Sequence, residues 1–134
     1  MPDTLLCTVV TPEQTALETK ADFVALPLFD GEIGIAANHS PLIGRLGYGE
    51  MRIKAGGSTL TYYVDGGFVQ VADNVVAVLT NRATPAGNLD APTAERQLGE
   101  ALQRQANTPE LFEIRERLIA QARAQLRTAR RARL

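Results

Sequence analysis

Glycine, asparagine and proline interrupt the chain repeatedly between residues 30 and 53, and the apolar runs between them are short. Gly34, Asn38 and Pro41 favour turns, because glycine and asparagine tolerate positive φ and proline fixes its own φ. Strands this short are not stable alone and need to pair with neighbouring strands in a sheet. The segment therefore predicts an all-β region with many tight turns.

The same pattern covers the first 85 residues. The connections 54–58, 65–67 and 72–74 are hairpin-length and contain glycine, aspartate or asparagine, so successive strands are expected to be antiparallel. Short runs rich in β-branched or aromatic residues mark a sandwich or barrel. The expected strands are Leu5–Val10, Ala21–Leu28, Gly31–Ile35, Met51–Lys54, Thr59–Val64, Phe68–Val71 and Val75–Thr80.

After the linker at residues 85–88 the apolar period changes from two to three or four, which is typical of helices. Asp90 is expected to cap a first helix that has Pro92 in its first turn. Thr108 is the expected N-cap of a second helix, with Pro109 at its first position. The second helix carries one apolar stripe, made of Leu111, Ile114, Leu118, Ala122, Leu126 and Ala129.

Charge divides the chain near the same place. Residues 1–88 contain nine Asp and Glu against five Lys and Arg, a net charge of −4, whereas residues 89–134 contain six acids against nine arginines, a net charge of +3. The fold class expected is therefore α+β by segment, with an antiparallel β-sandwich at residues 1–85 and a two-helix antiparallel hairpin at residues 86–134. The arginine-rich tail lacks interleaved aromatic residues, so no nucleic-acid partner is expected.

Composition limits the class of protein further. Hydrophobic residues make up 45% of the 134 residues, which supports a modest folded core. The apolar run Val75–Leu79 is far shorter than the ~20 residues that span a bilayer, and no charged-then-apolar leader is visible. The single cysteine, Cys7, cannot form an internal disulfide or a four-cysteine zinc site. These features predict a soluble protein of a reducing compartment.

Three motifs, in order, resemble a known family. They are G-E-I-G-I at residues 31–35, N-H-S-P-L at residues 38–42 followed by G-E-M-R-I at residues 49–53, and Y-V-D-G-G-F-V-Q-V at residues 63–71. The combination, placed before a helical hairpin, is similar to the ε subunit of F-type ATP synthases, the equivalent of the mitochondrial δ subunit. Residues 36–39 depart from the Leu-Pro-Gly-His common in the family, but Asn38 tolerates the left-handed geometry of a glycine.

The resemblance implies a non-catalytic subunit of the central stalk, which couples the γ subunit to the c ring and regulates ATP hydrolysis through its C-terminal helices. The implied partners are γ, the c-subunit ring and the α and β subunits of the catalytic head. The implied place is the cytoplasmic face of a bacterial inner membrane, with membrane association only through the complex. No cofactor and no bond chemistry are expected. The alternative is a stand-alone β-sandwich binding module whose helical hairpin mediates self-association.

The resemblance also implies a contact loop for the c ring within residues 31–42, with Glu32, Asn38 and His39 as its polar residues. The alternative is that these residues are merely solvated. His39 beside Ser40 does not suggest a catalytic pair, because adjacent side chains rarely face each other and no third orienting group is evident. No catalytic residue and no metal ligand is therefore expected.

The arginines of the second helix are the expected regulatory contacts to the catalytic subunits: Arg115, Arg117, Arg123, Arg127, Arg130 and Arg131. Some bacterial ε subunits bind ATP through an Ile/Leu-Asp-x-x-Arg-Ala segment, which corresponds here to residues 89–94. Thr93 replaces the arginine of that pattern, and helix capping explains Asp90 equally well. Asp90, Arg123 and Arg127 are accordingly doubtful candidates for nucleotide binding, and regulation without ATP is expected.

Overall fold

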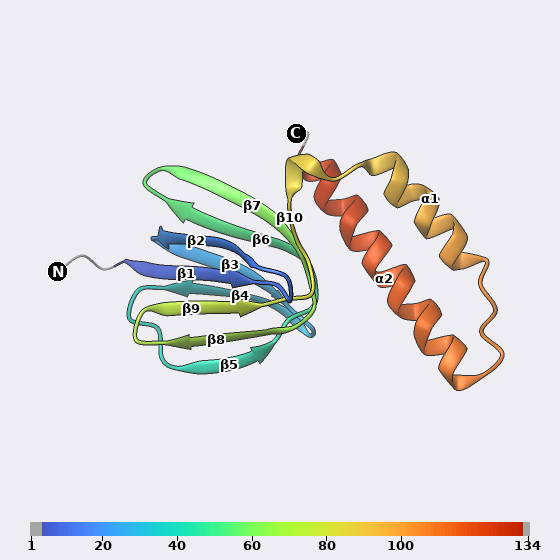
Figure 1. The fold of residues 1–134 in the computed structure, drawn as a ribbon, viewed down its shortest axis with the longest axis horizontal. Coiled ribbons are helices and arrows are strands. Elements are labelled where there is room, and N and C mark those ends of the chain that lie inside the picture. Colours follow the sequence, from blue (N-terminus) through green and yellow to red (C-terminus); the bar gives the residue numbers. More distant parts are fainter. Residues whose placement is uncertain (1–3, 133–134) are drawn as a thin grey trace. The chain divides into compact units, whose positions relative to one another are not determined.

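The structure, a computed structural model, describes residues 4–132 of the chain. It divides into two compact units, Met1–Pro85 and Ala86–Leu134. The first unit is a sandwich of two five-stranded sheets and the second is a pair of helices (Figure 1). The expected fold class, an antiparallel-rich β-sandwich followed by two helices, is confirmed.

The first sheet has the strand order β2-β1-β9-β8-β5 and the second sheet the order β10-β7-β6-β3-β4. Neighbouring strands are antiparallel except β1 and β9, which pair in parallel. The strands of the first sheet are β1 (Leu5–Val10), β2 (Thr15–Ala21), β5 (Leu42–Arg45), β8 (Phe68–Ala72) and β9 (Val75–Leu79). Those of the second sheet are β3 (Phe23–Leu28), β4 (Gly31–Ala36), β6 (Tyr48–Ala55), β7 (Ser58–Asp65) and β10 (Ala83–Pro85).

The core between the sheets is built by alternate residues of the strands, because successive side chains of a strand point to opposite faces. On β1, for example, Leu5, Cys7 and Val9 are buried while their neighbours face outward. Burial raises the pKa of the Cys7 thiol to about 12, so this thiol stays neutral and acts as a small apolar core residue.

Three strands escape the sequence pattern. β2 is mostly polar, with Glu18 and Lys20 on its outer side, and β5 has only four residues, one of them Gly44. β10 has three residues and ends at Pro85, which a sheet tolerates because β10 lies at its edge. These strands depend on pairing with stronger neighbours, because each of them is either very short or largely polar.

The turns confirm the expected turn chemistry. Asn38 has φ 66°, a left-handed conformation that asparagine tolerates. Positive φ also occurs at Asp73 and Asn74 in the hairpin between β8 and β9, and at Gly56 and Gly57 in the hairpin between β6 and β7. Gly66 and Gly67 also have positive φ, but the connection at residues 65–67 is not the hairpin expected from the sequence, because it leads from β7 in the second sheet to β8 in the first.

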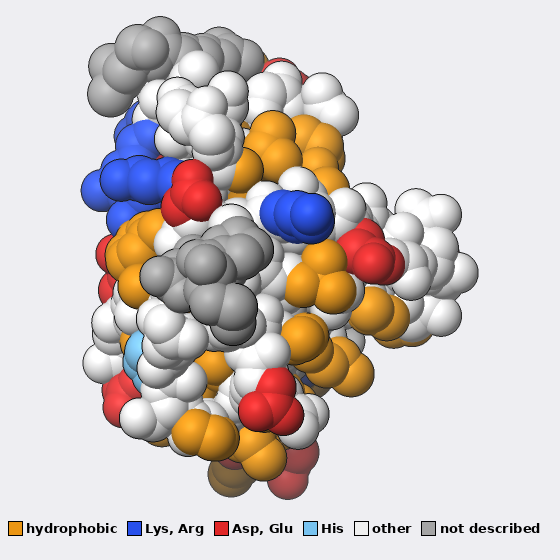
Figure 2. Space-filling model, turned by 90° about the vertical axis from the view of Figure 1, so that its left-hand side faces the viewer, with side chains coloured by type: hydrophobic (Ala, Val, Ile, Leu, Met, Phe, Trp, Pro, Cys, Tyr) orange, Lys and Arg blue, Asp and Glu red, His pale blue; other side chains and the backbone are white. Residues whose placement is uncertain are grey.

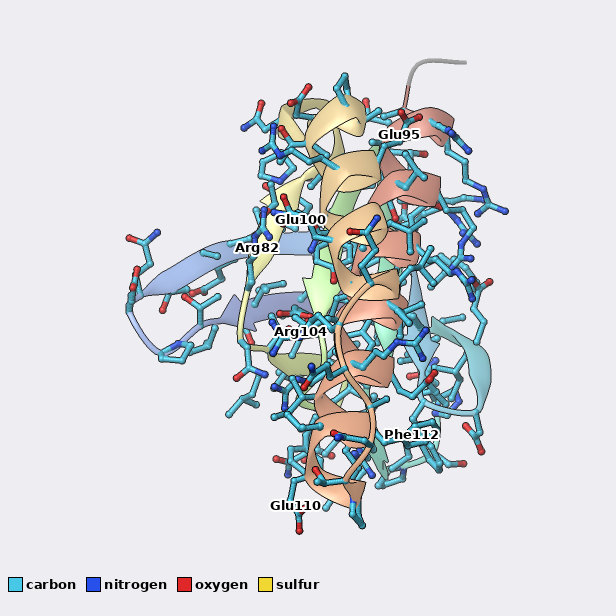
Figure 3. All side chains as sticks on the ribbon, turned by 90° about the vertical axis from the view of Figure 1, so that its right-hand side faces the viewer. Arg82, Glu95, Glu100, Arg104, Glu110 and Phe112 are labelled. Atoms are coloured by element: carbon cyan, nitrogen blue, oxygen red, sulfur yellow. The ribbon has the colours of Figure 1, made fainter. Side chains whose placement is uncertain are left out.

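The second unit begins with a short 3-10 helix, η1 (Ala86–Asn88), followed by α1 (Ala91–Leu102) and α2 (Pro109–Arg131). Thr108 is the N-cap of α2 as expected, and its side chain accepts a hydrogen bond from the backbone N–H of Leu111 at 3.1 Å. The helix α1 ends at Leu102, and residues 103–108 connect it to α2. Figure 3 shows Glu95 near the start of α1 and Glu110 at the opposite end of the hairpin, at the start of α2.

Candidate protein-docking surfaces

The outer face of the first sheet is apolar across four strands. Its most exposed large side chains are Ile43, Phe68 and Leu79, which are 76%, 58% and 51% exposed. The full outward-facing set consists of Leu6, Thr8 and Val10 on β1, Val75, Ala77 and Leu79 on β9, Phe68, Gln70 and Ala72 on β8, and Ile43 and Arg45 on β5. A contiguous apolar patch on a folded surface is typical of a protein-interaction site.

The outer face of the second sheet is polar by comparison. Arg52 on β6 donates to Glu50 at 3.0 Å and to Glu32 on β4 at 3.2 Å. Lys54 lies over the Phe23 ring, 5.7 Å from its centroid. Figure 2 shows the side of the molecule that lies at the left of Figure 1. On that side, exposed hydrophobic side chains form patches with charged side chains between them. The second sheet thus carries ion-paired charges on its outer face, and the outer face of the first sheet is the candidate docking face.

Sequence reasoning missed this face, although a signal for it was present. The run Val75–Leu79 is apolar at every position, and β1 is apolar at all positions except Thr8. Such a run is usually assigned to a strand buried on both sides. In an antiparallel-rich sandwich one side of each strand faces away from the core. A strand that is apolar on both sides therefore exposes apolar side chains on the outer face, which indicates that a partner covers them.

The three residues expected to form one c-ring contact loop do not lie together. Glu32 is near the start of β4, whereas Asn38 and His39 follow its end. Six residues of extended chain span roughly 20 Å, so Glu32 and Asn38 belong to opposite ends of the sandwich. A single contact loop containing all three is therefore ruled out by geometry. A contact of any one of them with the c ring stays a prediction.

Glu32 is an exposed carboxylate held in position by an arginine on β6, two strands away in the same sheet. Arg52 bridges Glu32 and Glu50, and its pKa is raised above the ordinary value, first by the hydrogen bond with Glu50 and then by Glu32. One guanidinium between two carboxylates leaves the group with a net negative charge. Glu32 therefore presents a charge of restricted mobility at its end of the sandwich.

Asn38 instead has a structural contact. Its backbone N–H donates to Oδ1 of Asn74 at 2.6 Å, and Nδ2 of Asn74 donates to Oδ1 of Asn38 at 3.3 Å. These bonds join the loop after β4 to the turn between β8 and β9. His39, half-buried beside it, has Nδ1 2.7 Å from the backbone oxygen of Ser40. Of the three residues, Glu32 is the exposed carboxylate, and its contact is the ion pair with Arg52.

The six arginines of α2 fall into different environments. Nη2 of Arg115 donates to the backbone oxygen of Leu102 at 3.2 Å, at the end of α1, so Arg115 connects the two helices. Arg130 pairs with Glu95 on α1 at 2.9 Å. Exposed arginines without an ion pair in the described part of the chain include Arg117, Arg123 and Arg127.

Four of these arginines share one surface of α2. A hollow of about 460 Å³ is lined by Arg123, Leu126, Arg127, Arg130 and Arg131. Several guanidinium groups close together attract acidic partners and phosphate. This surface contains Arg123 and Arg127 but not Asp90, and Leu126 is its apolar residue.

Asp90 occupies the N-cap position of α1 but makes no capping bond from its side chain. Its Oδ2 instead accepts a hydrogen bond from the Thr93 hydroxyl. The expected capping bond from the Asp90 side chain is therefore absent. The Asp90 carboxylate accepts from Thr93 instead, the residue that stands in place of the arginine of the nucleotide-binding pattern. Nucleotide binding by Asp90, Arg123 and Arg127 stays untested.

Other kinds of site find no support in residues 4–132. No three His, Cys, Asp or Glu side chains within this range gather as metal ligands. Within the same range, none of the helices has the length and apolar character needed to span a membrane.

The chain is a β-sandwich with one apolar outer face followed by a helical hairpin, and a face of this kind is typical of a protein that binds another protein. Residues 4–86 match the profile of the family described as ATP synthase, Delta/Epsilon chain, beta-sandwich domain. The ATP synthase epsilon chain of Rhodopirellula baltica is 51% identical over 92% of this chain and 97% of its own length. That of Nitratidesulfovibrio vulgaris is 36% identical over 93% and 88%. The chain belongs to the ATP synthase delta/epsilon family.

Solved structures share the fold at low sequence identity. A chain of the Euglena gracilis mitochondrial ATP synthase, in a structure of OSCP, F1 and c-ring, superposes with a TM-score of 0.84 at 23% identity, over 92% of this chain and 80% of that one. A chain of the Tetrahymena thermophila mitochondrial ATP synthase, in a structure of central stalk and c-ring, gives 0.74 at 14% identity, over 93% and 96%. Both comparisons show the same fold.

Proposed function

We propose that this chain is a non-catalytic central-stalk subunit of an F-type ATP synthase that couples the γ subunit to the c ring. The observation that carries the proposal is the apolar outer face of β1, β9, β8 and β5 in a chain of the delta/epsilon family. An exposed face of this kind needs a partner with an apolar surface of its own. The γ subunit is the partner assigned to it, since the matched Tetrahymena structure is one of a central stalk and c-ring.

The c ring is assigned to the end of the sandwich that carries Glu32. Glu32 is exposed, and Arg52 restricts its side chain, so less conformational entropy is lost when a partner binds it. A packed sandwich between γ and the ring suits the transmission of torque, because protein interiors are dense and deform little.

The helical unit is assigned to regulation. The exposed arginines of α2 suit acidic surfaces of the α and β subunits, and their attraction to them is screened by salt. Its contacts with the other synthase subunits would hold this subunit at the cytoplasmic face of the bacterial inner membrane. Its association with the membrane would therefore be indirect. No step of this role uses a bound nucleotide.

The docking face is tested by changing Ile43 to alanine in the full-length chain. Ile43 lies on β5 and is 76% exposed, so its removal leaves the core intact. We expect the affinity for the isolated γ subunit of the same synthase to fall about fivefold, since losing an interface side chain of this kind costs about 1 kcal/mol. Isothermal titration calorimetry measures the affinity, and circular dichroism checks that the melting temperature is unchanged.

A matched control is Leu60→Ala. Leu60 is 41% exposed on β7 of the second sheet, away from the proposed face, and its loss should leave γ binding within about twofold. If wild-type protein does not bind γ and instead forms a stable self-associated species, the alternative of a stand-alone binding module is correct.

A further inference from the structure

The outer face of the first sheet ends in a row of four side chains that lie side by side on four strands. Strand register pairs Val10 with Leu79, Leu79 with Phe68, and Phe68 with Arg45. Because neighbouring strands are ~4.8 Å apart, the row is roughly 14 Å long. It consists of three apolar side chains and one cation at its end.

This row borders a hollow of about 830 Å³ at the end of the sandwich. The volume falls within the ~300–1,000 Å³ of typical binding pockets. Besides the row, the lining includes Leu46, Tyr48, Thr80 and Asn81. The polar groups of Thr80 and Asn81 are already engaged, since the Thr80 hydroxyl accepts from the backbone N–H of Asp65 and Asn81 donates to its backbone oxygen.

Arg45 brings the one charged side chain among the described residues that line this hollow. Its guanidinium lies over the Phe29 ring, 5.6 Å from the centroid. Stacking on an aromatic ring restricts the side chain and leaves the edge of the guanidinium able to donate hydrogen bonds. A cation ordered in this way loses less entropy when it pairs with a carboxylate.

We propose that this hollow binds a segment of the γ subunit that places an Asp or Glu carboxylate on Arg45 and an apolar side chain against Val10, Phe68 and Leu79. Charge complementarity requires the acid, and the apolar row requires the neighbouring side chain. The c ring is assigned to the same end of the sandwich, but the row belongs to the face already assigned to γ, so γ is taken as the occupant and this inference rests on the proposed function. Arg45 would set the register of the subunit on its partner.

The test compares three full-length variants in their binding to isolated γ at low and at high salt. Arg45→Glu should weaken binding about tenfold at low salt, because it sets like charges against each other, and the difference should shrink at high salt. Arg45→Lys keeps the charge but loses the stacked guanidinium, so it should weaken binding less than Arg45→Glu does. Lys54→Glu makes the same charge reversal on the second sheet and should bind γ like the wild type. Melting temperatures show whether each variant is folded.

A second measurement identifies the partner group. In the complex with Arg45→Lys, a carbodiimide should join the new amine to a nearby carboxylate, and mass spectrometry then locates the cross-linked peptide. A cross-link to an acidic peptide of γ supports the proposal. In a complex that also contains the c ring, a cross-link to the c subunit alone overturns the assignment to γ.

The outcomes separate this inference from the proposed function. If Arg45→Glu binds γ as tightly as the wild type while Ile43→Ala still weakens binding, the face is correct and the role of the hollow is wrong. If neither change affects binding, both the hollow and the docking face are wrong.

Discussion

Replacing Gly67 with alanine should destabilise the sandwich by about 3–5 kcal/mol, a large part of the ~5–15 kcal/mol that stabilises a typical domain. A Cβ built on Gly67 would lie 1.9 Å from the backbone oxygen of Leu79, and the residue has φ +101°. To relieve this clash, the start of β8 and the end of β9 would have to move apart. That movement would disrupt the row of Val10, Leu79, Phe68 and Arg45. Urea unfolding, monitored by tyrosine fluorescence, measures the loss of unfolding free energy.

The chain supplies two controls for this change. Gly57 has φ +84° with no atom near a built Cβ, so Gly57→Ala should cost only the backbone strain, about 1–2 kcal/mol. Gly99 lies within α1 with open space around it, so Gly99→Ala should stabilise that helix by about 0.5–1 kcal/mol. Equal losses from Gly67→Ala and Gly57→Ala would show that φ strain alone matters and that the close approach to Leu79 does not.

The elements with strong local signals were predictable from sequence. Leu5–Val10 was expected as a strand over its whole observed length because it is a short apolar run that includes β-branched residues, which favour strands. Thr108 and Pro109 fixed the start of α2, because capping chemistry is local. By contrast, β10 has only three residues, and its existence depends on pairing with β7.

The candidate sites were less predictable, because they depend on contacts between distant residues. The hydrogen bonds of Asn38 go to Asn74, 36 positions away, and sequence spacing gives no sign of them. Arg115 and Arg130 looked alike as helix arginines, yet each contacts α1. Only a folded hairpin shows which arginines stay available for a partner.

The exposed arginines of α2 lead us to expect that the helical unit inhibits ATP hydrolysis by the assembled synthase. Removing residues 86–134 should raise the rate of ATP hydrolysis by about tenfold, within the range of a regulatory coupling of ~1–3 kcal/mol. The cut falls between the two compact units, so the sandwich keeps its own core and its docking face. Hydrolysis by purified complexes reconstituted with truncated or full-length chain measures the effect.

The exposed arginines should account for much of this inhibition. An exposed ion pair contributes under ~1 kcal/mol, so a single change of Arg117, Arg123 or Arg127 to glutamine should raise hydrolysis only slightly, and the triple change should raise it severalfold. The double change of Arg96 and Arg104 to glutamine is the control, since it also removes arginines from the helical unit but outside α2. Added salt should lower inhibition by the full-length chain and leave the triple variant nearly unaffected. If the truncated and full-length complexes hydrolyse ATP equally fast at low salt, the hairpin does not inhibit, and its arginines serve assembly instead.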